Sequence, residues 1–495
     1  MSLLLLLDDG PLDLRSLFSG GQQGVLLDPS DFSTLFQDAA GTTPVTAVGQ
    51  TVILAKDKSG RGNHVTLTNV VLGISADGFY HFKTNGTSSF GVTGNIDFSG
   101  TDKLTIFAGV RKITDAATGT VCEFSSNAAA TPGSFWFVVR STKRWSAGSY
   151  GTVLASNEAG QGNAPETDVV TISYDISAPR IQQRIDGQEY PAGVGTQGTG
   201  NYGNFPLFIG AKNGTSSFFN GEIYQLVVRG SASTASEIQM AERIIARKTY
   251  KITPTDLFIV TGQSNAEGRG TSGPAVAAGR AYYFASGTRT SLLGDPVGGA
   301  NTGSAWPAFA NAYYSQKGIP TAWVEQATGG SGLIAASNPS FNWSTTGTLR
   351  ATARNAAIAA VSWFGNSLDT PLRRTYIIWQ QGEQDSATYN GTTISDVEYQ
   401  AELGRLFTYF SQGLPALSGI LVSELGAHRD GVGAANWNLI RAAQNAGVAE
   451  NDLAYLAFTG AKNFPAQGKM SDTVHYNQAG YDEMGAAMAA YAALL

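Results

Sequence analysis

DLFIVTGQSNA, residues 256–266, decides the fold of the second half of this 495-residue chain. Four apolar residues run directly into a polar turn, which is typical of a buried strand that ends in a loop. A serine placed just after a strand and a glycine lies on a tight turn, where backbone N–H groups can stabilise an oxyanion. The stretch therefore predicts a strand with a candidate nucleophile, Ser264, at its carboxyl end. A plain helix cap is the alternative role for this serine.

From Leu257 onward, short apolar runs alternate with amphipathic stretches of a dozen residues or more. This alternation predicts a parallel sheet covered by helices on both faces, whose reactive groups gather at the carboxyl ends of the strands. The predicted strands are Leu257–Val260, Ala322–Gln326, Tyr376–Trp379, Ile420–Ser423 and Leu453–Phe458, and the predicted helices are Ala305–Gln316, Gly347–Trp363, Asp396–Gly413, Ala434–Ala446 and Ala479–Leu494.

A serine nucleophile needs a base, and this half of the chain holds two histidines, His428 and His475. Asp472 precedes His475 by three residues, so both side chains can meet within one loop, and the carboxylate can hold the imidazole while its other nitrogen faces the serine. His428 has a weaker context, and a surface loop is the alternative position for either histidine.

Two further polar turns follow predicted strands. One contains Gly329 and Gly330, whose backbone N–H groups can approach a ligand closely. The other is Gln381-Gly382-Glu383-Gln384-Asp385, in which two acids and two amides are costly to bury unless they pair. We expect an oxyanion site or a supporting network there, and a flexible or solvated turn is the alternative for each.

The first half contains many short strand-like runs broken by Gly, Asn, Asp and Pro, which favours an all-β sandwich or jelly roll. Asp186-Gly187 predicts a two-residue hairpin, and Thr234 with Glu237 predicts a capping box at the start of a closing helix. We expect an N-terminal docking segment at 1–24, a jelly roll at 25–250, a linker at 251–256 and an α/β domain at 257–495.

Composition excludes several classes of protein. The net charge of −6 and pI of about 5.4 argue against a nucleic-acid-binding face. One cysteine, Cys122, excludes an internal disulfide framework and a cysteine-based zinc cage. No apolar run is long enough to span a membrane. The leucines Leu3–Leu7 lack a basic flank and are followed by Asp8 and Asp9, so we expect a docking peptide or a buried strand rather than a signal peptide.

Four blocks of the second half resemble the SGNH hydrolase superfamily, in its branch of sialate O-acetylesterases and carbohydrate acetylesterases. They stand in the family's order: GQSN at 262–265, GG at 329–330, QGEQD at 381–385 and DTVH at 472–475. The resemblance implies a three-layer, flavodoxin-like sheet and a carboxylic ester hydrolase that needs no metal or organic cofactor.

The same resemblance implies roles for individual residues. Ser264 would be the nucleophile, His475 the base and Asp472 its orienting acid, and the oxyanion hole would use N–H groups of Ser264 and Gly330 with an amide side chain. The superfamily's asparagine is matched here by Gln384, and Gln381 is the preferred amide donor. Residues expected to support these groups or contact substrate are Gln263, Asn265, Gly329, Glu383, Gln384 and Asp385.

The first half resembles concanavalin A-like (LamG-type) jelly rolls in DKSGRGNH at 57–64, in GEI at 221–223 and in its closing helix, and residues 24–49 resemble bacteriophage tail proteins. Together these imply a homotrimeric tail spike or fibre that removes acetyl groups from bacterial surface polysaccharide. It would attach to other virion tail proteins through its N-terminus and be located in the virion tail, made in host cytoplasm. A carbohydrate-binding receptor with a vestigial esterase site, and a purely structural virion protein, are the alternatives.

Overall fold

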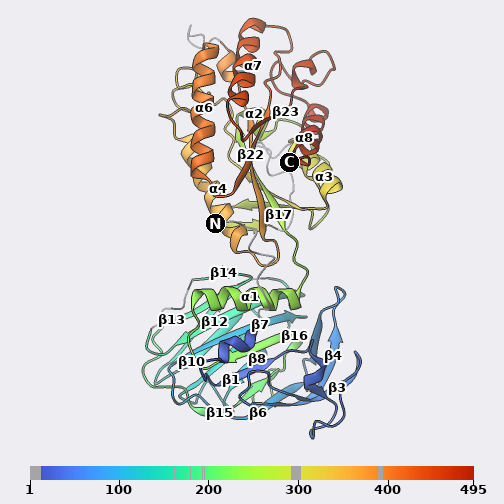
Figure 1. Ribbon diagram of the computed structural model, residues 1–495, viewed down its shortest axis with the longest axis vertical. Coiled ribbons are helices and arrows are strands. Elements are labelled where there is room, and N and C mark those ends of the chain that lie inside the picture. Colours follow the sequence, from blue (N-terminus) through green and yellow to red (C-terminus); the bar gives the residue numbers. More distant parts are fainter. Residues whose placement is uncertain are drawn as a thin grey trace. The chain divides into compact units, whose positions relative to one another are not determined.

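The computed structural model describes residues 13–160, 162–178, 180–191, 193, 195–290, 303–387 and 394–495. These residues form two compact units, one from residues up to 252 together with 366–369, the other from 253–365 and 370–495. The leucines Leu3–Leu7 lie outside the described residues. Figure 1 shows an all-β unit with one long helix and a second unit in which helices flank a sheet.

The N-terminal unit is a large antiparallel β sandwich, as the sequence predicts. Its 16 strands pair into one continuous hydrogen-bonded sheet. They are β1 Gly24–Leu27, β2 Leu35–Phe36, β3 Thr51–Ala55, β4 Val65–Ile74, β5 Tyr80–Asn85, β6 Phe90–Asp97, β7 Lys103–Lys112, β8 Gly119–Phe124, β9 Ser134–Val139, β10 Trp145–Tyr150, β11 Leu154–Ala159, β12 Glu166–Asp175, β13 Arg180–Ile185, β14 Gln188–Glu189, β15 Asn204–Ile209 and β16 Asn220–Arg229.

Strand β7 explains how this unit is layered. Leu104 and Ile106 point into the sandwich core, while Phe107 belongs to a second apolar cluster with Ile245 of helix α1, Ala235–Thr249. The helix lies across β7, β12 and β16 (Figure 1). Because α1 covers the outer face, β7 is buried on both sides. Alternate side chains of β7 therefore point into two different apolar layers, and neither set faces solvent.

Several local predictions in this unit are confirmed. Asp186 and Gly187 join β13 to β14 with φ values of 49° and 81°, which a tight hairpin turn requires. The capping box at Thr234 and Glu237 is present in full. A 3-10 helix at Leu14–Phe18 packs its leucines and Phe18 against the α1 cluster, so this part of the predicted docking segment contributes to the N-terminal unit.

The C-terminal unit is built on a seven-stranded sheet of order β19-β18-β20-β17-β21-β22-β23, parallel except at β19. Its strands are β17 Thr255–Gly262, β18 Ala281–Ala285, β19 Thr288–Thr290, β20 Thr321–Glu325, β21 Leu372–Gln380, β22 Leu417–Ser423 and β23 Ala454–Phe458. Its helices are α2 Ser264–Glu267, α3 Trp306–Lys317, α4 Leu349–Asn366, α5 Glu383–Ser386, α6 Asp396–Gly413, α7 Ala434–Ala449 and α8 Gln478–Ala492, with a 3-10 turn at Ala461–Asn463.

Alternate residues of the central strand β17 face opposite helical layers. Leu257 and Ile259 pack in the cluster that contains α4, α6 and α7, and Phe258 and Val260 pack in the cluster that contains α3 and α8. Figure 1 shows these two groups of helices on opposite sides of the sheet. The predicted three-layer α/β arrangement is therefore confirmed.

Two features differ from the sequence-based expectation. Strands β18 and the edge strand β19 were not predicted. β18 is an apolar run, AYYFA, as long as the predicted strands, and its omission was an error, whereas β19 is only three residues long and has no apolar residue. Strand β17 begins at Thr255, so Thr255 and Asp256 of the expected linker 251–256 are strand residues. Asp256 is fully buried and pairs with Arg373 and with the hydroxyl of Tyr313, which holds it inside the sheet.

Among the described residues, no helix is both long and apolar enough to cross a bilayer.

Replacing Arg373 by Met should destabilise the C-terminal unit, because Asp256 would keep its burial and lose its counter-charge. Breaking a fully buried pair costs roughly 3–5 kcal/mol, and the 29% exposure of Arg373 reduces our expectation to about 2–3 kcal/mol in the free energy of unfolding. Urea unfolding of the full chain would measure it. Arg374→Met is the matched control, since among the described residues Arg374 forms one hydrogen bond, to the hydroxyl of Tyr376, and no ion pair. An equal loss in both variants would contradict the role given to the buried pair.

Candidate active site

The candidate nucleophile lies where the central strand of the sheet ends. Gly262, the last residue of β17, has φ of 122°, and a Cβ at this position would lie 1.9 Å from the carbonyl oxygen of Gln380. Only glycine fits so close an approach to β21. The chain then turns at Gln263 into helix α2, which begins at Ser264. The Ser264 side chain is therefore fixed by its backbone at the carboxyl end of the sheet.

Ser264, His475 and Asp472 form a connected chain of hydrogen bonds. The Ser264 Oγ lies 2.9 Å from His475 Nε2, and His475 Nδ1 lies 2.6 Å from Asp472 Oδ2. The carboxylate can accept the Nδ1 proton, which leaves Nε2 as the acceptor for the serine O–H. The structure thus brings together the three residues predicted from the sequence, across a separation of 211 positions.

Asp472 also shapes the loop that presents the histidine. Its Oδ1 accepts the backbone N–H groups of Val474 and His475 at 2.8 and 2.7 Å. Partial burial raises the pKa of the Asp472 carboxyl, but the hydrogen bonds from His475 and Val474 lower it by more. The resulting pKa is below the usual 3.8. A lowered pKa means that the carboxylate stabilises the folded loop above pH 3.8 and that this contribution is lost only as the pH falls below that value.

Asn265 ties the serine turn to the histidine loop. Its Nδ2 donates to the carbonyl of Val474 at 3.0 Å, and its Oδ1 accepts the N–H of Tyr476 at 3.3 Å, so that it binds the backbone on both sides of His475. The same amide donates to Glu383 Oε1 at 2.6 Å and accepts from the Tyr481 hydroxyl at 2.8 Å. All four hydrogen-bonding positions of the amide are used. Because Asn265 follows Ser264 in one turn, it fixes the spacing between nucleophile and base.

Two backbone N–H groups are available for an oxyanion. That of Ser264 lies in the first turn of α2, where N–H groups have no intrahelical acceptor. Gly330 has φ of 70°, and a Cβ there would meet no atom within 4 Å, so its backbone borders open space. The preceding Gly329 donates its N–H to Glu267 Oε1 at 2.7 Å, which ties the glycine loop to helix α2.

Gln381, the amide preferred as the third oxyanion donor, is held inside a buried network. Its Nε2 lies within hydrogen-bonding distance of Asp385 Oδ2, Gln263 Oε1 and the Ser331 carbonyl, at 2.5, 3.1 and 3.1 Å. Its Oε1 accepts the hydroxyl of Tyr399 at 2.8 Å. Two amide hydrogens therefore already have three acceptors, and in this arrangement neither is left for a substrate.

Gln263 offers a free amide beside the nucleophile. Its Oε1 accepts from Gln381 Nε2 and from the backbone N–H groups of Gly382 and Gln384, at 3.1, 3.4 and 3.2 Å. Two backbone donors fix which end of the amide faces the turn, so the Nε2 end points the other way. Nε2 makes no hydrogen bond in the described structure, yet it is not among the fully buried polar atoms without a partner. Gln263 is only 3% exposed, so Nε2 is a nearly buried donor without a partner among the described residues, on the residue that precedes Ser264.

Asp385 holds the loop that follows Gly330. It accepts the N–H groups of Leu333 and Ile334 at 2.7 and 3.0 Å and the hydroxyl of Ser337 at 2.6 Å. Burial raises the pKa of its carboxyl, and these donors lower it only in part. The remaining amide of the predicted block, Gln384, donates to the Ser337 carbonyl at 3.0 Å and supports the same loop.

Two supporting residues, Tyr399 of α6 and Gln444 of α7, were not predicted from the sequence. Gln444 donates to the carbonyl of Gln381 at 2.7 Å, and both side chains are fully buried under the QGEQD turn. Both occupy inward-facing positions of amphipathic helices, where nothing in the pattern distinguishes a supporting polar residue from core. The other candidate base, His428, contacts Asp430 and Trp437 rather than Ser264.

No group of three or more His, Cys, Asp or Glu side chains that could hold a metal ion occurs in the part of the chain that the structure describes.

The comparisons with known proteins divide the chain in the same way. Residues 254–493 match the family model of carbohydrate esterases described as sialic acid-specific acetylesterases, and residues 59–239 match that of the concanavalin A-like lectin/glucanase superfamily. No curated protein matches the chain.

Among solved structures, the binding domain of botulinum neurotoxin serotype D/C aligns with a TM-score of 0.34 and 11% identity, over 49% of this chain and 55% of that one. The receptor-binding domain of botulinum neurotoxin D gives 0.35 and 9%, over 49% and 55%. The chain thus spans about half the length of these proteins, and likenesses this weak support no argument.

The serine turn, the histidine loop and the supporting polar network all lie within residues 254–493, which match the carbohydrate esterase family model, and the residues that match the concanavalin A-like model precede them in the chain.

Proposed function

We propose that the chain is a serine O-acetylesterase that removes acetyl groups from sugars. The observation that carries the proposal is the contact of His475 Nε2 with Ser264 Oγ at 2.9 Å, within a domain that matches a family of carbohydrate esterases. The connected hydrogen bonds support an active site rather than a vestigial one.

The reaction follows from the positions of the three side chains. Ser264 Oγ attacks the acetyl carbonyl while His475 Nε2 takes its proton, and Asp472 stabilises the imidazolium. His475 then protonates the departing sugar oxygen, which leaves an acetyl group on Ser264. A water molecule, deprotonated by the same histidine, releases acetate and restores the serine.

The negative charge that develops on the carbonyl oxygen needs preorganised donors. We assign the N–H groups of Ser264 and Gly330 to this role, as expected from the family resemblance. For the third donor we propose Gln263 Nε2, because it has no partner among the described residues and belongs to the residue that precedes the nucleophile, whereas the amide of Gln381 is already occupied.

The biological setting remains the one inferred from the sequence. We propose an acetylated bacterial surface polysaccharide as substrate and a homotrimeric phage tail protein as context, attached to other virion tail proteins through its N-terminal segment. The support is the match of residues 59–239 to a superfamily that includes lectins, together with the tail-like sequence at 24–49. Acetate release from acetylated capsular polysaccharides, with and without prior chemical de-O-acetylation, would test the substrate.

Ser264→Ala and His475→Ala should each lower kcat for a chromogenic acetyl ester by at least a thousandfold without unfolding the chain, and the double variant should lose little more, because the two groups act as a unit. His428→Ala is the control and should keep its activity. A Ser264→Ala enzyme within tenfold of wild type would contradict the assignment.

Gln263→Glu tests the third donor with little change in shape, since the new carboxylate still accepts the bonds from Gln381, Gly382 and Gln384 but has a charged oxygen in place of the Nε2 donor. We expect kcat to fall by about 10²–10³ with KM nearly unchanged, the usual effect of removing one oxyanion donor. Gln263→Met removes the Nε2 donor without adding a charge and should lose at least as much, which separates the loss of the donor from the effect of the new charge. Steady-state kinetics of both variants would measure these effects. A Gln263→Glu enzyme with kcat within threefold of wild type would refute the role of Gln263 as an oxyanion donor.

A further inference from the structure

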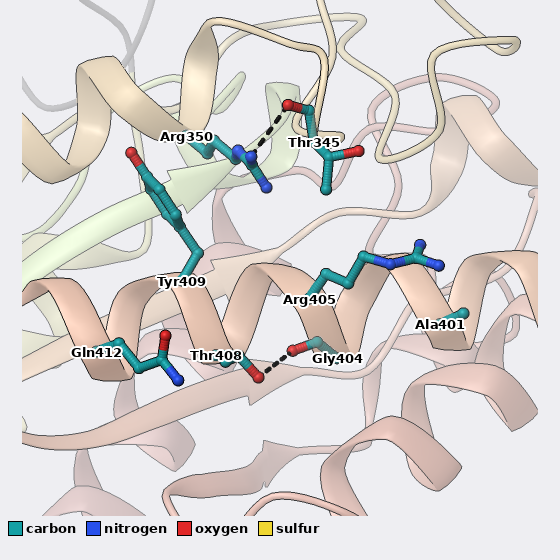
Figure 2. Close-up of a pocket in the computed structure, with 8 residues that line it drawn as sticks. All are labelled: Thr345, Arg350, Ala401, Gly404, Arg405, Thr408, Tyr409 and Gln412. Atoms are coloured by element: carbon teal, nitrogen blue, oxygen red, sulfur yellow. Dashed lines mark hydrogen bonds between the residues drawn. The ribbon is translucent and has the colours of Figure 1, made fainter.

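A cavity of about 470 Å³ lies on the C-terminal unit where helix α4 begins beside helix α6. Figure 2 shows Arg350 of α4 leaning toward Thr345 and Tyr409, with the exposed side of α6 forming the other wall. It is lined by Thr345, Arg350, Ala401, Gly404, Arg405, Thr408, Tyr409 and Gln412. None of these residues belongs to the candidate active site, and its volume is within the range of sites for small molecules.

Positive charge gathers at this cavity with little compensation. The guanidinium groups of Arg350 and Arg354 lie 4.6 and 4.2 Å from the centre of the Tyr409 ring. Neither forms an ion pair with a carboxylate of the described residues, although the chain as a whole has a net charge of −6. Ring stacking stabilises a guanidinium but leaves its in-plane N–H groups free to donate.

The remaining donors can be assigned individually. Arg350 donates one hydrogen bond, from Nη2 to the Thr345 carbonyl at 3.0 Å. The third arginine, Arg405, is 57% exposed and pairs with Glu402. Glu402 in turn accepts the N–H of Thr345, so the acid is occupied on both oxygens. Arg350 therefore keeps most of its five donors for a ligand, and Arg405 keeps those not used by Glu402.

The uncharged groups of the cavity suit hydroxyl-rich ligands. Thr408 donates its own hydroxyl proton to the Gly404 carbonyl at 2.8 Å, which leaves its oxygen as an acceptor. Gln412 and Thr345 add an amide and a hydroxyl on the exposed rim. A planar guanidinium fork matches a carboxylate in two parallel hydrogen bonds, and the neutral groups match sugar hydroxyls.

We propose that this cavity is a second, non-catalytic binding site, which holds a carboxylate-bearing sugar unit between Arg350 and Arg405. Such a site would bind acidic polysaccharide independently of the Ser264 centre. The carboxylate is the group that the arginines would recognise. A phosphate carries similar charged oxygens, so the experiment must distinguish binding of the acidic sugar from binding of phosphate.

Isothermal titration of the full chain with an unacetylated glucuronate tetramer tests the proposal, with a neutral glucose tetramer and inorganic phosphate as the other two ligands. We expect saturable binding of the glucuronate tetramer that weakens as salt is raised, and at least tenfold weaker binding of the other two. Equal binding of the neutral tetramer, equal binding of phosphate, or no binding of the glucuronate tetramer would overturn the proposal.

Variants locate the site. Arg350→Gln combined with Arg405→Gln should weaken binding of the glucuronate tetramer at least tenfold, while hydrolysis of a small acetyl ester stays unchanged. Arg280→Gln is the matched control, because Arg280 also stacks on a tyrosine, Tyr314, at 4.8 Å, but lines no part of this cavity. If the double variant fails to fold, Arg350→Lys keeps the charge and removes the fork, and should still weaken binding. Unchanged affinity in a folded variant would refute the assignment.

Discussion

The hydrogen bond between Ser264 Oγ and His475 Nε2 joins two loops that lie 211 positions apart, and the candidate chemistry depends on keeping it. A serine hydroxyl gains nothing from a base that it cannot reach, and a shift of 1 Å can cost a large factor in rate. The loop of His475 is partly exposed, and its histidine side chain is 24% accessible, so packing alone does not fix it. Asn265 supplies the missing constraint by binding the backbone on both sides of the histidine.

This constraint explains why the polar residues of the site form one network. Asn265 is itself held by Glu383, which also accepts the amide of Gln380 at the end of β21. Gln263 connects the serine turn to the turn after β21, and Asp385 connects that turn to the loop behind Gly330. Of the two residues that flank Ser264, Gln263 thus binds the turn after β21, and Asn265 binds both that turn and the histidine loop. Glu383 Oε2 and Gln380 Oε1 are buried without a partner among the described residues, but the other hydrogen bonds named here connect the three segments and support one geometry.

The sequence predicted the parts of this arrangement that depend on local pattern. Leu257–Val260 shows the continuous apolar run of a strand buried on both faces, and the Asp472–His475 spacing brings two side chains together within one loop. The order of the family's motif blocks then implied that this loop meets Ser264. Strand β18 has a comparable run, AYYFA, that was not predicted as a strand, whereas the edge strand β19 is three residues long and has no apolar residue. The supporting roles of Tyr399 and Gln444 depend on tertiary packing, and the competition for the amide of Gln381 depends on acceptors from three separate segments, which no spacing reveals.

The central claim, that Asn265 holds base and nucleophile in register, is tested most directly by the rate at which a fluorophosphonate labels the serine. Mass spectrometry of the labelled peptide would locate the adduct. The account predicts one adduct per chain, on Ser264, formed at least a hundredfold more slowly in a folded Asn265→Ala variant. Labelling at the same rate in both proteins, or an adduct on another serine, would contradict it.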